Sequence, residues 1–389
     1  MMTRAWRRVR WLDESVIAPV VASRVQCLFT SRNSFTSRML RVLPQGIRKR
    51  TATLLGCVES GSVKIFSIAR ACAVLGWLWI SIGGALAAAP PLFVLNSLEA
   101  NVSVIDPVTW TETARIPTGK EPHHLYLTPD EKSIIVANAL GDTLTFLDPR
   151  TAQIQRTVRG IVDPYHLRFT PDMKWFITAA NRLNHVDFYR WDGKELTLVQ
   201  RVATSRTPSH LWIDSRSTTV YSTMQDSDEL VAIDIATQTI KWRTKTGAMP
   251  ADVYGSPDDK RLFVGLTGSD CVEVFDVSGR EPVSIKKIKT GNGAHAFRAA
   301  GDGRHLYVSN RVANSISKID MTTQQVVESY PVPGGPDCME VSADGRFIYV
   351  SSRWARKLSV VDTEAKKVVR QVTVGKSPHG VWTLQHAPR

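Results

Sequence analysis

The sequence lacks the short motifs that identify the common enzyme and nucleotide-binding sites. It contains no glycine-rich phosphate loop, no Gly-x-Ser-x-Gly turn, no His-Glu-x-x-His and no Cys-x-x-Cys. Cysteine is also scarce: the 389 residues include 5, of which Cys27, Cys57 and Cys72 precede residue 90. The other two, Cys271 and Cys338, cannot make a disulfide-rich scaffold of so long a chain. The hydrophobic core and the topology must therefore stabilise the fold.

Most of the chain also lacks an excess of charge of one sign. The formal net charge is +13, but residues 1–89 hold 13 Lys and Arg against Asp13, Glu14 and Glu59, a net charge of +10. The remaining residues include 36 basic and 33 acidic side chains, a net charge of +3. The high isoelectric point therefore belongs to the N-terminal part, and it does not favour nucleic-acid binding by the rest.

Residues 71–89 read ACAVLGWLWISIGGALAAA and carry no charge. Lys64 and Arg70 precede them, and the alanines at 85–89 provide small residues at the spacing that signal peptidase requires. This pattern predicts a cleaved signal peptide, a periplasmic or secreted protein, and no stable membrane span after cleavage. An uncleaved anchor is the alternative, because the uncharged stretch approaches the length that crosses a bilayer.

Residues 1–62 form an Arg- and Ser-rich extension with no internal repeat. A signal peptide normally begins close to its basic region, so we expect that translation starts near Val63 rather than at Met1. We accordingly divide the chain into an N-terminal extension plus signal peptide, residues 1–89, and one folded domain, residues 90–389.

The folded domain repeats itself seven times. Segments such as PHHLYLTPD and PYHLRFTPD, most of them led by proline, begin at residues 122, 164, 208, 250, 293, 336 and 378, at steps of 42, 44, 42, 43, 43 and 42 residues. Each of the first six segments is followed by an apolar run such as IIVAN, an alternating run such as LTFLD and a weaker fourth run. Four short strands in a period of this length are typical of one blade of a β-propeller.

The pairs LYVSN…SISKID and IYVSS…LSVVD resemble the repeats of YVTN-type β-propellers of the bacterial periplasm. The resemblance covers residues 92–386 and implies a seven-bladed propeller. It implies little about function, because the residues of this motif are mainly architectural.

The two ends of the domain predict how the ring closes. It opens at residues 92–96 with a second strand that has no first strand, and it ends at residues 378–384 with a first strand that has no successor. Pairing them completes a seventh blade and removes two open sheet edges. The predicted fold is therefore all-β, a seven-bladed β-propeller whose N- and C-terminal strands share one blade.

One position of the repeat collects residue types that bind metals. The loops that enter the inner strands and those that follow the second strands lie on one face of a propeller, here called the upper face. The position two residues after the start of each segment should lie in the channel near this face. By blade, it holds His124, His166, His210, Asp252, His295, Cys338 and Gly380. Imidazole, carboxylate and thiolate are metal ligands, so we expect a divalent metal site there, with the three consecutive histidines as its centre. The alternative is that these side chains hydrogen-bond neighbouring strands and stabilise the blades.

A second set of residues follows the second strands on the same face. Arg182, Arg311 and Arg353 could hold an anionic group by paired hydrogen bonds, together with His295 and His379. The alternative is that these arginines pair with nearby acids. No catalytic residue is predicted, since Cys338 is the only candidate nucleophile and the adjacent Asp337 should raise the pKa of its thiol.

These observations favour an exported, non-enzymatic and monomeric binding protein. We expect it to bind a metal ion, an anionic ligand or a protein partner at the upper channel mouth. Three alternatives remain: a lactonase-like hydrolase, a haem-d1-type cofactor domain, and a single-stranded DNA-binding protein that uses Trp354 with Arg182 and Arg311. Seven blades rather than eight count against the haem domain, and the small net charge counts against DNA binding.

Overall fold

The computed structural model describes residues 89–389. The signal peptide and the start site near Val63 lie outside the described residues, and both stay predictions. Within the described part, no helix is long and apolar enough to cross a membrane.

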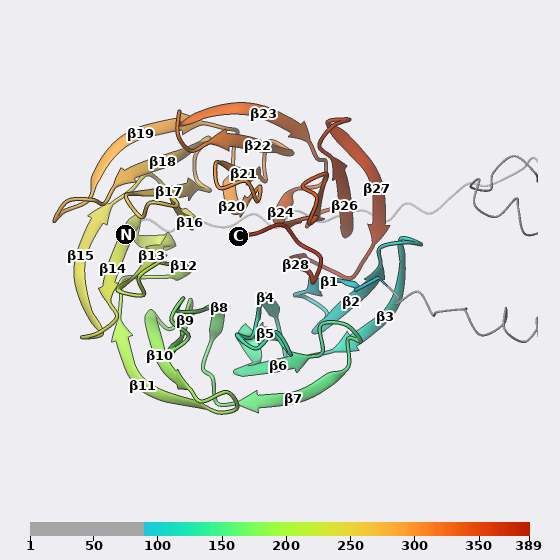
Figure 1. The fold of residues 1–389 in the computed structure, drawn as a ribbon, viewed down its shortest axis with the longest axis horizontal. Coiled ribbons are helices and arrows are strands. Elements are labelled where there is room, and N and C mark those ends of the chain that lie inside the picture. Colours follow the sequence, from blue (N-terminus) through green and yellow to red (C-terminus); the bar gives the residue numbers. More distant parts are fainter. Residues whose placement is uncertain (1–88) are drawn as a thin grey trace, which may run out of the picture. The chain divides into compact units, whose positions relative to one another are not determined.

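Seven antiparallel sheets of four strands each stand around a central channel (Figure 1). The prediction of an all-β, seven-bladed propeller is confirmed. The strand closest to the channel begins each blade in six of the seven sheets, and the chain then moves outward strand by strand. In the remaining sheet, with the order β28-β1-β2-β3, the inner strand comes from the C-terminus.

The inner strands begin at a proline in every blade except one, where Ala294 takes that place. They are β28 (Pro378–Thr383), β4 (Pro122–Leu127), β8 (Pro164–Phe169), β12 (Pro208–Ile213), β16 (Pro250–Gly255), β20 (Ala294–Ala299) and β24 (Pro336–Val341).

The second and third strands of each blade are largely buried on both faces, as their apolar runs predict. The second strands are β1 (Leu92–Asn96), β5 (Ile134–Asn138), β9 (Trp175–Ala180), β13 (Thr219–Met224), β17 (Arg261–Leu266), β21 (His305–Asn310) and β25 (Phe347–Ser352). The third strands are β2 (Asn101–Asp106), β6 (Thr143–Leu147), β10 (His185–Trp191), β14 (Glu229–Asp234), β18 (Cys271–Asp276), β22 (Ser315–Asp320) and β26 (Lys357–Asp362).

The fourth strands form the outer wall and are mostly exposed. They are β3 (Thr111–Pro117), β7 (Ile154–Arg159), β11 (Leu196–Ala203), β15 (Thr239–Lys245), β19 (Val283–Lys289), β23 (Gln325–Pro331) and β27 (Lys367–Thr373). Two short 3-10 helices, η1 (Ala139–Gly141) and η2 (Gln225–Ser227), lie in loops after second strands.

The hydrophobic core lies between successive blades rather than in one central mass. One cluster joins Ile177 and Phe188 of one sheet to Leu211 and Val231 of the next. Each sheet is thus sandwiched between two neighbours, and no blade buries its apolar faces alone.

The ring closes as the sequence predicts. Strand β1 pairs antiparallel with β28, so that Phe93 lies opposite Trp382 and Val94 opposite Val381. Trp382 is 1% exposed and belongs to a core cluster with residues of the blade β4–β7. The C-terminal strand therefore completes one blade and also packs against the next.

Candidate functional site

A β-bulge near the start of each inner strand positions the channel side chains. In β4, Pro122 pairs with Asn138 and Leu125 with Val136, so two residues of β4 lie opposite one residue of β5. The pairing shifts at the same place in the other six inner strands. A bulge lets two adjacent side chains lie on the same side of a strand, whereas regular pleating alternates them. Two successive residues of each inner strand can therefore reach the channel.

These bulges create two stacked rings of side chains near the upper end of the channel. The first ring consists of His123, Tyr165, Ser209, Ala251, His295, Asp337 and His379. The second ring consists of His124, His166, His210, Asp252, Ala296, Cys338 and Gly380. These assignments follow from the strand pairing.

The pairing corrects the predicted place of one histidine. Ala294 pairs with Asn310 as Pro122 pairs with Asn138, so Ala294 is the first residue of its inner strand. His295 is therefore equivalent to His123 and belongs to the first ring, not beside His124. In the alignment of the repeats, Gly293 stood opposite the prolines of the other blades, so the start of this repeat was placed one residue too early.

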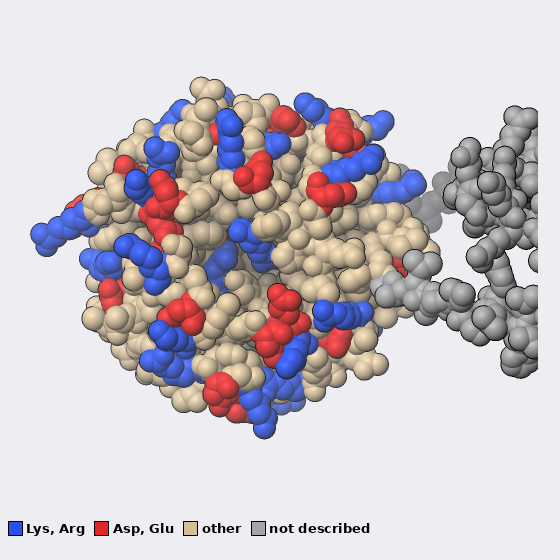
Figure 2. All heavy atoms as spheres, in the orientation of Figure 1, with Lys and Arg blue, Asp and Glu red and all other residues tan. Residues whose placement is uncertain are grey.

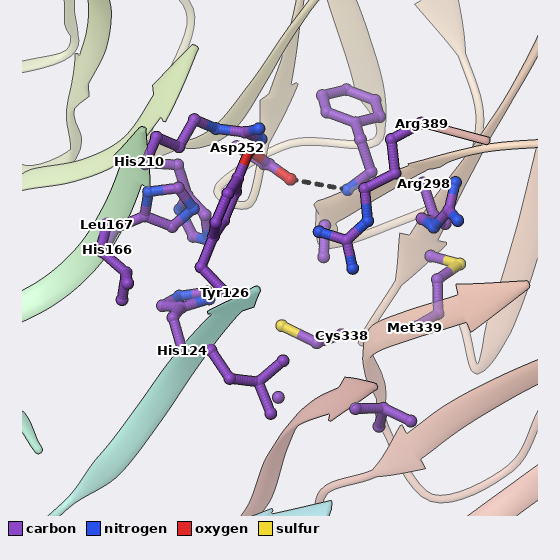
Figure 3. Close-up of a pocket in the computed structure, with 16 residues that line it drawn as sticks. His124, Tyr126, His166, Leu167, His210, Asp252, Arg298, Cys338, Met339 and Arg389 are labelled. Carbon is purple, nitrogen blue, oxygen red and sulfur yellow. Dashed lines mark hydrogen bonds between the residues drawn. The ribbon is translucent and has the colours of Figure 1, made fainter. Parts of the chain in front are cut away.

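The second ring brings together the three histidines that the sequence singled out. His124, His166 and His210 each offer a nitrogen atom, and these atoms all lie within 4.8 Å of one another. The centroids of the three imidazole rings are 4.6 to 4.8 Å apart. All three side chains are buried, and Figure 3 shows them on one side of a cavity in the channel.

Two of these histidines have a ring nitrogen without a partner. Nε2 of His124 and Nε2 of His210 are buried and accept or donate no hydrogen bond within residues 89–389. Nδ1 of His210 lies 3.1 Å from the carbonyl of Ala251 and 3.0 Å from the hydroxyl of Ser209; when this nitrogen carries the proton, it donates to the carbonyl and the lone pair is on Nε2. Leu211 N–H donates to Nδ1 of His166 over a long 3.3 Å, and a metal ion at that nitrogen would replace this bond.

The environment keeps the three imidazoles neutral. Burial lowers the pKa of His124 and of His166 well below the usual range, and neighbouring imidazoles lower it further. Burial also lowers the pKa of His210. Neutral imidazole is the form that binds metals, so the ligand lone pairs are available at pH 7.

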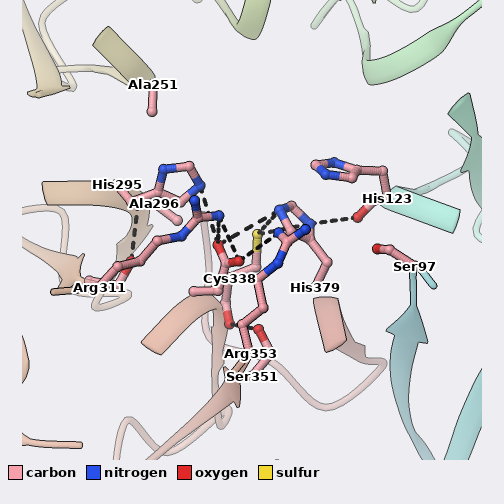
Figure 4. Close-up of polar contacts among 12 residues, drawn as sticks. Ser97, His123, Ala251, His295, Ala296, Arg311, Cys338, Ser351, Arg353 and His379 are labelled. Carbon is pink, nitrogen blue, oxygen red and sulfur yellow. Dashed lines mark hydrogen bonds and ion pairs between the residues drawn. The ribbon is translucent and has the colours of Figure 1, made fainter. Parts of the chain in front are cut away.

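The first ring contains a buried carboxylate that sequence reasoning did not assign to the site. Asp337 is fully buried, and Nη2 of Arg311 lies 2.6 Å from both of its oxygens. Nη1 of Arg353 lies 3.0 Å away, Nε2 of His295 3.2 Å and Nε2 of His379 3.7 Å (Figure 4). Four of the five predicted ligand-binding residues thus converge on one acid.

The charges around Asp337 hold it ionised. Burial alone would raise the pKa of this carboxyl group, but Arg311 and the two histidines lower it well below its usual value. Burial lowers the pKa of His295 to about 3, with a further contribution from Arg311. Arg311 and Arg353 therefore pair with an acid of the protein itself, as the alternative interpretation of these arginines supposed, and that acid is the buried Asp337.

Three other predicted residues take separate roles in the structure. Arg182 pairs with Asp163 at 2.6 Å and with Glu121 at 2.9 Å, and it makes no contact with Asp337. The oxygens of Asp252 accept hydrogen bonds from the N–H groups of Val253 and Phe297, each at 2.8 Å.

The thiol of Cys338 lies beside a histidine of the first ring, with Sγ 3.5 Å from Nδ1 of His379. Burial raises the pKa of its thiol well above the usual value, and Asp337 raises it further, in the predicted direction.

The cavity of about 90 Å³ extends from the second ring toward the lower end of the channel. The three histidines, Asp252 and Cys338 line its upper part. Arg168 and Arg298, two residues farther along β8 and β20, line its lower part together with Arg389. Figure 3 shows Arg298 and Arg389 across the cavity from His124, and Figure 2 shows basic side chains in the central hollow.

Exposed apolar side chains surround the upper mouth of the channel. They lie in the loops that follow the second strands: Leu98, Leu140, Leu183, Val312 and Trp354, which are 52–74% exposed. The second strands end beside the first residues of the inner strands, so these side chains lie at the same end of the channel as the first ring. A protein partner at this face and a monomeric state both stay predictions.

The fold places this protein in the class of seven-bladed β-propellers, with a bulge in each inner strand and two rings of mostly polar side chains in the channel. The model of the YNCE-like β-propeller family matches residues 69–389. The chain belongs to this family. No curated protein sequence shows a significant similarity to it.

Several solved structures share the fold. A functionally unknown protein from Desulfotomaculum acetoxidans has 14% sequence identity and a TM-score of 0.66 over 76% of this chain and 98% of its own. The periplasmic gluconolactonase PpgL of Pseudomonas aeruginosa has 19% identity and a TM-score of 0.65 over 75% and 98%. The dihydro-heme d1 dehydrogenase NirN has 15% identity and a TM-score of 0.58 over 76% and 75%. At these identities the similarity shows the fold alone.

Proposed function

We propose that this propeller is an exported, non-enzymatic protein that binds a divalent transition-metal ion through His124, His166 and His210. The observation that carries the proposal is the approach of three ligand nitrogens to within 4.8 Å of one another inside a buried cavity. Two of the rings keep a buried nitrogen that has no hydrogen-bond partner within residues 89–389 and could accept a ligand. Three imidazoles at one ion are a common ligand set for Zn²⁺.

The other two groups of ligand atoms in the channel are less suited to a cation. Asp337, His295 and His379 form one of them, but the guanidinium groups of Arg311 and Arg353 already lie beside this carboxylate. A divalent ion there would have to displace two guanidinium groups from the only carboxylate of the group. The third group shares His124 with the proposed site, and its other two imidazoles, His123 and His379, lie against each other with their ring centroids 3.6 Å apart.

The geometry also weighs against single-stranded DNA binding. The pairing of Arg311 and Arg353 with Asp337 leaves these charges poorly available to the phosphates of single-stranded DNA.

Zinc titration tests the proposal. We expect the mature protein to bind one Zn²⁺ by isothermal titration calorimetry, and His166→Ala or His210→Ala to weaken binding by about a hundredfold or more. Loss of an outer-shell partner alone costs about 10–100-fold, and loss of a ligand should cost at least as much. His305→Ala is the control, because His305 is not among the residues that line the cavity and pairs with Asp302. Equal affinity in all variants would show that the three histidines are structural.

The lactonase-like alternative needs its own experiment, because an ion with three imidazole ligands and an open position can activate water. We expect zinc-loaded protein to hydrolyse gluconolactone no faster than buffer with the same zinc concentration. A rate that exceeds this background and disappears in His166→Ala would assign a hydrolase instead.

A further inference from the structure

The lower part of the cavity is lined by arginine side chains, and some of their N–H donors have no hydrogen-bond partner among the described residues. Arg298 is well satisfied, since it pairs with Glu340 and donates to the carbonyls of Ala299, Ala387 and Pro388. By contrast, the neighbouring Arg389 and Arg168 keep free donors facing the cavity.

Arg389 and Arg168 each make one hydrogen bond in the part of the chain that the structure describes. Nη2 of Arg389 donates to Glu340 at 2.6 Å, and Nε of Arg168 donates to the carbonyl of Leu211 at 2.5 Å. Arg168 also stacks on Trp212, with its guanidinium carbon 5.0 Å from the ring centroid. These contacts orient both side chains and leave Nη donors of each available; the Arg389 side chain is 37% exposed. An arginine offers five donors in a planar arrangement that matches a carboxylate or phosphate.

The positive charge of a bound metal ion would favour an anion in the same cavity. Three neutral imidazoles leave both positive charges of a divalent ion uncompensated in a buried cavity. Asp252 lines the cavity, but backbone N–H groups of Val253 and Phe297 already bind its oxygens. An ion with three protein ligands also keeps a fourth position for an exogenous ligand.

We propose that a small oxyanion, a carboxylate or a phosphate, binds in this cavity between Arg168 and Arg389 and completes the coordination of the metal ion. This inference rests on the proposed function. A volume of about 90 Å³ holds several water molecules, which suits an anion of a few non-hydrogen atoms. The protein would thus hold a metal–anion pair rather than a bare cation.

Calorimetry with two probes tests the proposal. Acetate and inorganic phosphate are titrated separately into zinc-free protein and into protein loaded with one equivalent of Zn²⁺. We expect at least one of them to bind the loaded protein about tenfold or more tightly than the zinc-free protein, and the tighter probe identifies the chemical class. In Arg168→Gln and Arg389→Gln this affinity should fall by about tenfold, the value of one charge-assisted hydrogen bond. Arg280→Gln, on an exposed loop, should behave as the wild type.

The zinc affinity in anion-free buffer separates this proposal from the one on which it rests. Removal of a nearby positive charge should leave that affinity unchanged or increase it in Arg168→Gln and Arg389→Gln. If wild-type protein binds Zn²⁺ but neither anion, or if both glutamine variants bind the anion as tightly as the wild type, the anion site is refuted and the metal site stands. If wild-type protein binds no Zn²⁺, both proposals fall.

Discussion

Deletion of residues 377–389 is expected to abolish cooperative folding. This deletion removes β28, all six residues of which are buried, and with it the partner of β1. The loss of Trp382 alone, as a large buried side chain, would cost about 3–5 kcal/mol. The deletion also opens the contact between two blades and exposes the edge of β1. Together, these losses should exceed the free energy of unfolding of a folded domain, which is about 5–15 kcal/mol.

The measurement is thermal unfolding followed by circular dichroism, with a shorter deletion as the control. Removal of residues 385–389 keeps β28, which ends at Thr383, but removes the contacts of Arg389 and Ala387. We expect this control to melt cooperatively at a somewhat lower temperature. A chain that ends at Lys376 and melts at the temperature of the intact protein would contradict closure by the terminal strands.

Asp337→Asn is expected to destabilise the protein by about 3–5 kcal/mol at pH 7, the cost of removing one partner from a buried ion pair. Arg311 and Arg353 would lose their shared carboxylate, while the amide could accept only part of their hydrogen bonds. For a domain of this size the melting temperature should fall by about 10 °C. Glu281→Gln, at an exposed position in the loop before β19, is the matched control and should change it by less than about 1 °C.

The effect of Asp337→Asn should depend on pH in a defined direction. The pKa of Asp337 is lowered in the folded protein, so the ionised carboxylate contributes its full stabilisation above about pH 4, the pKa of an unfolded aspartate. That contribution is lost as the pH falls below this value toward the folded pKa. The difference between wild type and Asp337→Asn should therefore be constant from pH 5 to 7 and shrink below pH 4. A difference that instead grows below pH 4 would show that Asp337 does not carry the charge.

The fold could be predicted from the sequence because its signals repeat. Each blade contributes an apolar run that is buried on both faces, and seven copies at a nearly constant period leave few alternatives to a closed ring. The unpaired runs at Leu92–Asn96 and Pro378–Thr383 also predicted the shared blade. A single local ambiguity, a glycine next to an alanine where other blades have proline, was enough to misplace His295 by one residue.

The candidate site could be predicted only in part, because it depends on contacts across the channel. The shared repeat position placed His124, His166 and His210 together, as the structure does. Asp337 was missed because its role comes from Arg311 and His295 on the preceding blade and His379 on the following blade. The bulges that bring two residues per strand to the channel leave no local sequence signal. A comparison of Asp337 with His123 and His379 at the same position of the repeat could have revealed it.

X-ray absorption at the zinc K-edge tests the central claim most directly. Protein loaded with one equivalent of Zn²⁺ should show three imidazole nitrogens at about 2.0–2.1 Å and one further light ligand. The imidazole scattering should decrease in His166→Ala and stay unchanged in His305→Ala. A spectrum with fewer than two imidazoles, or the same spectrum in wild type and His166→Ala, would contradict a metal site at the second ring.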